Sequence, residues 1–84
     1  MKVKDKVKTG DSNHSIEWGS ATWDANDFSI RNRYNTEEGK FNYAGSGEIP
    51  WHDFKEMINE SLLRGHFNNA EISEILNNIS IVIG

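Results

Sequence analysis

Cysteine is absent from this chain of 84 residues. Disulfide bonds and thiolate-ligated metal sites are therefore excluded. Long hydrophobic runs are missing too: no stretch approaches the roughly 18 apolar residues of a membrane-spanning helix. Residues 1–10 are charged, unlike a secretory signal peptide. We therefore expect a cytosolic protein without membrane association, either a monomer with one small core or a homodimer.

Basic residues are scarce in the second half of the chain. The first 45 residues carry equal numbers of basic and acidic side chains, whereas Lys55 and Arg64 are the only basic residues from position 46 onward. The net charge of −4 therefore arises in the second half. An acidic surface favours a partner with a basic surface. An isoelectric point near 5.2 argues against direct binding to nucleic acid.

Three segments have the alternation of β-strands. In residues 15–23 the apolar side chains change parity at Gly19 and Ser20, which predicts a β-bulge there. Residues 24–26 are a turn, and residues 28–34 then alternate without interruption. Residues 41–43 continue the pattern after a turn that ends at Gly39, where glycine permits a positive φ. These segments predict a three-stranded antiparallel meander.

The periodicity changes after the only proline, Pro50. Apolar residues then recur at three- and four-residue spacing through residue 64, and Gly65 is a typical helix stop. Asn68, followed three residues later by Glu71, predicts a capping box at the start of a second helix. The β-branched residues 79–83 fit both a continuation of this helix and a short final strand.

The fold class that these elements predict is α+β, a three-stranded antiparallel β-meander packed on an αα-hairpin. A short fourth strand at the C-terminus is an alternative to helix there. Residues 1–84 are expected to form a single domain, in which residues 1–14 are either a flexible tail, the favoured interpretation, or an edge strand.

The two faces of the predicted sheet differ in character. One face carries aromatic and aliphatic side chains and is expected to lie under the helices. The opposite face is expected to be solvated, with its arginines paired to Glu17 or Glu38. That polar face carries Glu17, Ser29, Arg31, Arg33, Lys40 and Asn42.

No catalytic or metal-binding pattern is present. The three histidines, at positions 14, 52 and 66, lack the His-x-x-x-His or cysteine spacing of a zinc site. Gly45-Ser-Gly47 lacks the Lys-Ser/Thr of a phosphate-binding loop. The two helices have the lengths of a helix-turn-helix, but the second has no basic residue for DNA. We expect no enzyme activity, no metal and no cofactor; a small enzyme using His52 is an alternative of another class.

Two groups of residues are candidates for contact with a protein partner. The acids of the helices are spaced to form a negative surface on their outward faces. Exposed aromatic and arginine side chains are typical anchors of interfaces. The candidates are Asp53, Glu56, Glu60, Glu71, Glu74, Trp23, Arg31, Arg33 and Tyr34.

The block Phe28-Ser-Ile-Arg-Asn-Arg-Tyr-Asn-Thr-Glu-Glu-Gly-Lys-Phe41, followed by Glu48-Ile-Pro-Trp51, resembles short proteins of phages and mobile elements. Over residues 15–64 the chain is similar in kind to anti-CRISPR proteins. This resemblance implies a small non-enzymatic α+β domain that binds a CRISPR effector and blocks nucleic-acid access or nuclease activation. It implies no particular site residue.

Charge, size and resemblance together predict a non-enzymatic, phage-encoded inhibitor that occludes a basic, nucleic-acid-binding surface of an effector complex in the host cytosol. An antitoxin or immunity protein that caps a small toxin is the alternative, because it would use the same electrostatic attraction on a different partner. A structural module whose acids only confer solubility is a further alternative.

Overall fold

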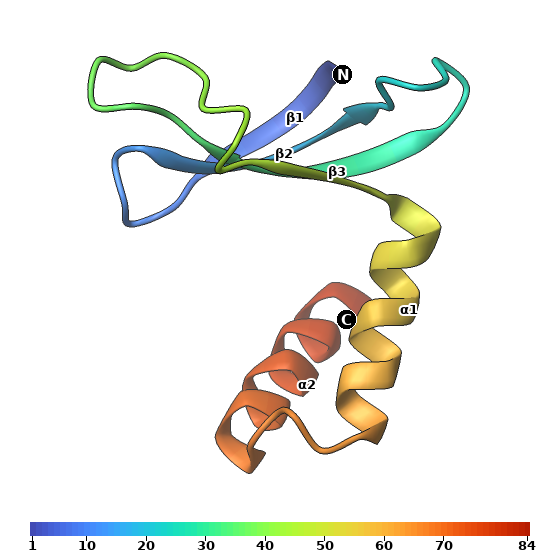
Figure 1. Ribbon diagram of the computed structural model, residues 1–84. Helices are drawn as coiled ribbons and strands as arrows, with labels where there is room; N and C mark the ends of the chain where they lie inside the picture. The colour runs from blue at the N-terminus through green and yellow to red at the C-terminus, as the bar shows by residue number, and fades with distance from the viewer. The chain divides into compact units, whose positions relative to one another are not determined.

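The fold is α+β, as the sequence predicts. The computed structural model describes all residues from Met1 to Gly84. The chain has four strands followed by two helices, and Figure 1 shows the helices after the sheet along the chain. The strands form one antiparallel sheet in the order β1-β2-β3-β4. The chain divides into two compact units, Met1–Phe54 and Lys55–Gly84, which are described separately. The elements are β1 (Lys2–Lys8), β2 (His14–Ser20), β3 (Phe28–Tyr34), β4 (Gly47–Pro50), α1 (Trp51–Leu63) and α2 (Asn69–Ile83).

The central strands β2 and β3 follow the predicted alternation. β3 has the predicted bounds, and the turn before it is present, since the Asp27 N–H donates to the Asp24 carbonyl at 3.0 Å. Glu17 lies opposite Arg31, and Trp18 lies opposite Ile30. Because successive side chains alternate between faces, these two pairs lie on opposite faces of the sheet.

The favoured interpretation of the N-terminal segment as a tail is wrong for residues 2–8, which form the alternative, the edge strand β1. Its backbone pairs with β2 along the whole of that strand's apolar region. Lysine at every second position keeps this exposed edge charged, which discourages pairing with a further strand. The other edge, β4, is short and ends in Pro50, which has no N–H to offer.

The predicted bulge at Gly19 and Ser20 is wrong, because the irregularity lies on the partner strand, between Val3 and Asp5 of β1. Gly19 instead allows a close approach of the two strands. A Cβ atom on Gly19 would lie 2.0 Å from the carbonyl oxygen of Lys2. The alternation of apolar side chains stops before Trp23 for another reason. Strand β2 ends at Ser20, and Trp23 lies in the following loop.

The predicted third strand at residues 41–43 is also wrong, because only Phe41 forms an isolated bridge, with Asn35. Side-chain oxygens, rather than the carbonyls of a neighbouring strand, accept hydrogen bonds from the backbone here. The Asn42 amide oxygen accepts from the Gly45 N–H at 3.1 Å. The Ser46 hydroxyl accepts from the Tyr34 N–H at 2.9 Å. The chain therefore turns through this segment, and β4 becomes the neighbour of β3. The predicted turn at Gly39 is present, with φ of +80°.

The core of the first unit is small. Ala21 and Ile30 are its only buried apolar residues. On the apolar face, Trp51 packs edge-on against Phe28, with ring centroids 5.5 Å apart. A hollow of about 210 Å³ remains on this face. Its lining is formed by Ile16, Ile30, Asn32, Ile49 and Phe54.

The second unit is a helical hairpin. α1 ends before Gly65, which has the predicted positive φ of +75°. α2 starts at the predicted capping box: the Asn68 side chain accepts from the Glu71 N–H at 2.8 Å, and the Glu71 carboxylate accepts from the Asn68 N–H at 2.9 Å. Residues 79–83, which also fitted a strand, continue α2 as helix. Neither helix has the length and apolar character needed to cross a membrane.

The close approach at Gly19 gives a test of the sheet. Gly19→Ala should lower the free energy of unfolding by about 1–3 kcal/mol, because the added methyl group must displace the β1 backbone. Gly47→Ala is the matched control, since nothing lies within 4 Å of a Cβ there. Urea unfolding followed by tryptophan fluorescence measures both. Equal effects of the two substitutions would contradict a close contact specific to Gly19.

Candidate protein-binding surfaces

The polar face of the sheet is built around the carboxylate of Glu17. Its Oε1 accepts from Arg31 Nε at 2.7 Å, and its Oε2 lies 3.6 Å from Arg33 Nη1. The strand register puts Glu17 directly opposite Arg31, with Arg33 two residues further along the same face. The predicted pairing of the arginines with Glu17 is therefore confirmed.

The expectation that this face is solvated is wrong at its centre, where Glu17 is 4% exposed and Ser29 is fully buried. The loop between β3 and β4 covers the two arginines of this face. Its Phe41 ring lies 4.8 Å from the guanidinium carbon of Arg31 and 4.6 Å from that of Arg33. One aromatic ring thus stacks against both cations, and their charge is shared between this ring and one carboxylate.

This arrangement holds Arg31 and Arg33 in structural contacts. Arg31 is bonded on the sheet side, which leaves little of its charge for a partner. Tyr43, in contrast, is 83% exposed, and its ring meets that of Phe41 edge-on at 4.3 Å. Tyr43 therefore extends the face outward as an exposed aromatic side chain, and the sequence interpretation missed it as an interface candidate.

Removal of the central carboxylate should be costly. Glu17→Ala leaves two guanidinium groups without their anion and should lower the free energy of unfolding by about 3–5 kcal/mol. Glu37→Ala, in the exposed tip of the β3–β4 loop, is the control and should change stability by less than about 0.5 kcal/mol. Both values come from urea unfolding. A small effect of Glu17→Ala would mean that the ion pairs are solvated rather than internal.

A second network joins the chain's N-terminus to β4 through Thr22. The Met1 ammonium donates to the Thr22 hydroxyl at 2.6 Å, and that hydroxyl donates to Glu48 Oε1 at 2.8 Å. The Thr22 N–H donates to Glu48 Oε2 at 2.9 Å. Partial burial opposes ionisation of Glu48, but these hydrogen bonds and the N-terminal charge outweigh it, so the pKa of Glu48 lies below its usual value.

The lowered pKa of Glu48 predicts a pH dependence of stability. Its contribution is complete above the pKa of an unfolded glutamate, about 4.3, and is lost as the pH falls through the lower pKa of the folded chain. The difference in unfolding free energy between wild type and Glu48→Gln should therefore shrink between about pH 6 and pH 3. A constant difference for Glu48→Gln would contradict the lowered pKa.

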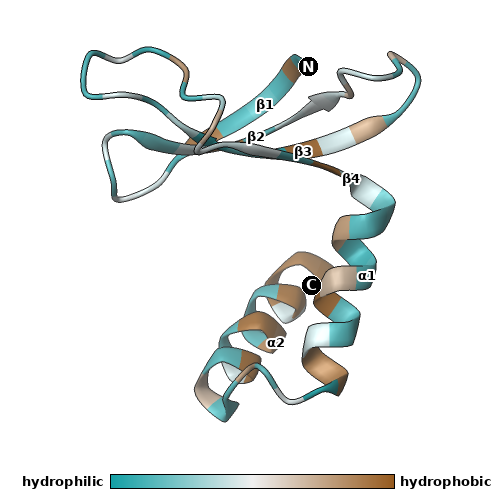
Figure 2. Ribbon diagram, viewed as in Figure 1, coloured by the Kyte–Doolittle hydropathy of each residue, from teal (hydrophilic) through white to brown (hydrophobic).

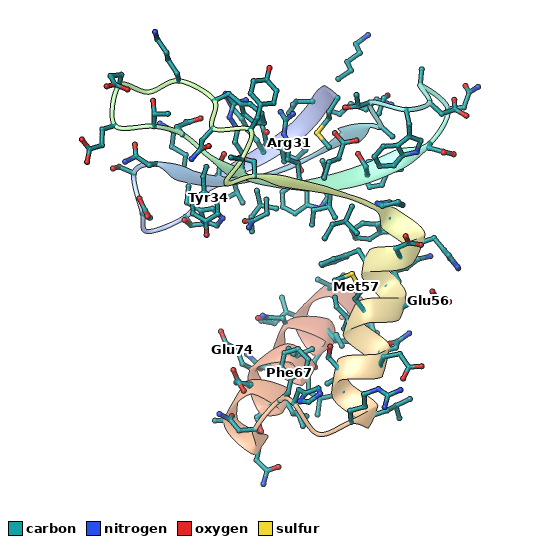
Figure 3. All side chains as sticks on the ribbon, in the orientation of Figure 1. Arg31, Tyr34, Glu56, Met57, Phe67 and Glu74 are labelled. Carbon is teal, nitrogen blue, oxygen red and sulfur yellow. The ribbon has the colours of Figure 1, made fainter.

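The remaining sheet candidates do not converge with the arginines. Tyr34 extends to the opposite side of the sheet from Arg31 (Figure 3). Its ring stacks on His14 with centroids 4.5 Å apart. Trp23 is half exposed in the β2–β3 loop, where its Nε1 donates to Asp27 Oδ2 at 3.1 Å. The predicted aromatic and arginine anchors are thus distributed over two faces and a loop.

The five acidic candidates of the helices are all exposed, but they do not form one surface. Figure 3 shows Glu56 of α1 and Glu74 of α2 pointing to opposite sides of the hairpin. Glu71 is used in the capping box of α2. Glu60 lies 3.6 Å from Arg64 in an exposed pair one helical turn apart.

A row of carboxylates does remain along α1. Asp53, Glu56 and Glu60 are three and four residues apart, so they follow one side of the helix. The apolar positions of α1 lie on its other side, where Ile58 and Leu62 are half-buried. We call Asp53, Glu56 and Glu60 the acidic row.

The side chains that commonly bind metal ions are dispersed in this structure. No group of three or more histidine, cysteine or carboxylate side chains is placed to hold a metal ion. The three histidines lie on separate elements: His14 in β2, His52 in α1 and His66 in the turn between the helices. Comparison with protein-family models, with curated proteins and with solved structures found no match for this chain.

Proposed function

We propose that this chain is a non-enzymatic binding protein that inhibits a nucleic-acid-processing effector by occupying its basic surface. The observation that carries the proposal is the acidic row of α1, which presents exposed carboxylates over two helical turns. Carboxylates spaced along a helix attract the Lys and Arg side chains that would otherwise contact phosphates. The effector class tested first is a CRISPR effector, because of the resemblance to anti-CRISPR proteins.

The division of charge within the chain supports a helix as the contacting element. In the sheet unit, the arginines are occupied by Glu17 and Phe41. In the helical unit, Lys55 and Arg64 are the only basic side chains. Arg64 lies one helical turn from Glu60 of the acidic row, and their contact is exposed and weak. Electrostatic attraction to a basic partner therefore concentrates on α1.

Charge reversal on the acidic row tests the proposal. Glu56→Lys with Glu60→Lys should weaken binding to a purified effector at least about tenfold, which is about 1.4 kcal/mol. The matched control is Glu37→Lys with Glu38→Lys, which changes the net charge equally on the exposed β3–β4 loop. Affinity is measured by competition with the effector's nucleic acid at low and high salt, and function by phage plating on hosts with defined CRISPR systems.

The outcomes are separable. Restoration of plating by wild type and by the loop variant, with loss in the α1 variant, supports the proposal. Equal loss in both variants would reduce the effect to net charge alone. Full activity in the α1 variant would rule out the acidic row as the contact surface. Failure of wild type to bind any effector or restore plating would overturn the inhibitory function itself.

A further inference from the structure

The second half of α2 combines an apolar surface with a complete absence of charge. From Ile75 to Ile83 there is no acidic or basic side chain. Figure 2 shows hydrophobic residues concentrated in these last turns. The apolar positions recur at three- and four-residue spacing, which places them on one side of the helix. We call Ile72, Ile75, Leu76, Ile79, Val82 and Ile83 the α2 stripe.

Within the helical unit, this stripe is largely exposed. Leu76 is 59% exposed, Ile79 47% and Ile83 79%, and neither helix contains a buried residue. Ile72 and Ile75, nearer the start of α2, are half-buried within the hairpin. Apolar surface of this kind, continuous over several turns, marks an interaction site in a soluble protein.

We propose that the α2 stripe is the interface between two copies of this chain, which pair their hairpins antiparallel into a four-helix bundle. Two hairpins supply the four helices that such a bundle needs to enclose a core. The spacing of the stripe is that of coiled-coil core positions, with isoleucine at Ile72, Ile75 and Ile79.

Charge favours a second copy in this orientation. The acids of α2, Glu71 and Glu74, lie in its first two turns. In an antiparallel pair centred on the middle of the stripe, the Glu71 side chains of the two copies lie on the order of 20 Å apart along the helix axis, and the Glu74 side chains on the order of 10 Å. Both separations exceed the screening length of about 8 Å at physiological salt. The neutral second halves then meet without repulsion, rimmed by the amides and hydroxyls of Asn77, Asn78 and Ser80.

Other occupants fit less well. A partner with a basic surface would find no carboxylate between Ile75 and Ile83. A lipid surface is normally met by helices with Lys or Arg on the polar face, and α2 has neither. The same chain, with its own neutral stripe, is the partner whose chemistry matches.

The size of the patch sets the expected strength. Leu76, Ile79, Val82 and Ile83 of the stripe are between 47% and 86% exposed. At roughly 100 Å² per aliphatic side chain, they expose about 270 Å² of apolar surface per copy. With a polar rim, two copies would bury about 1,000 Å² in total, at the low end of specific interfaces. We therefore expect a dimer with a dissociation constant of about 1–100 μM.

Sedimentation equilibrium of the full chain, from about 1 to 500 μM, tests the pairing. The mass should rise from 9.6 kDa toward twice that value. Ile79→Glu should keep the chain monomeric. Ile81→Glu is the matched control: it introduces the same charge in the same helix, but at a position 70% exposed and two residues away, on the other side of α2. Ile81→Glu should leave the dimer intact. Circular dichroism is the check that both variants keep their helices.

Orientation is tested with single cysteines, since the natural chain has none. Leu76→Cys lies near the middle of the stripe and should form a disulfide-linked dimer on oxidation. Ile83→Cys lies at one end, so in an antiparallel pair it should cross-link much less. Equal cross-linking at both positions would overturn the antiparallel arrangement. This experiment also covers the case in which Ile79→Glu prevents folding.

Two results would overturn the dimer. One is a wild-type chain that stays monomeric at about 500 μM; if that monomer sediments with phosphatidylserine-containing vesicles, the stripe belongs to a lipid surface instead. The other is equal dissociation by Ile81→Glu and Ile79→Glu. Neither result bears on the acidic row of α1, whose charge-reversal variants are assayed against the effector and leave the α2 stripe unchanged.

Discussion

The pairing of one buried carboxylate, that of Glu17, with two arginines organises the sheet unit. Glu17 is 4% exposed, and it lies between Arg31 and Arg33 on one side while Phe41 covers both guanidinium groups. A buried carboxylate is tolerated only when cations and hydrogen bonds replace its water. The strand register between β2 and β3 and the course of the β3–β4 loop are both tied to this requirement. A one-residue slip of register would turn Glu17 away from Arg31 and bury an unpaired charge.

The apolar core is too small to organise the molecule in the same way. Only Ala21 and Ile30 are buried apolar residues, and most of the aromatic side chains are half-buried or exposed. A chain of this length buries a smaller share of its surface than a larger domain does. Its polar pairs therefore specify the sheet.

The sequence predicted those features that depend on neighbouring residues. The bounds of β3, the helix stop at Gly65 and the capping box at Asn68 each follow from a pattern within a few residues. For β1 the sequence left a tail and an edge strand open, because charged strands at an edge resemble polar tails in composition. β4 was missed because the choice between residues 41–43 and 47–50 is made by Asn42 and Ser46, whose hydrogen bonds no periodicity reveals. The Thr22–Glu48 bond joins residues 26 positions apart and has no local signal.

The two proposed contact surfaces would bind through different interactions. The acidic row of α1 acts through charge, so dissolved salt screens it. The α2 stripe acts through burial of apolar area, which excluded salts such as sulfate strengthen. Their separation on different helices also means that one chain can use both at once: a dimer formed through α2 would carry two acidic rows. Such a dimer would engage a repetitive or two-fold basic partner with an effective concentration that a monomer lacks. Weak self-association would then make inhibition depend on the concentration of the chain more steeply than one-to-one binding does.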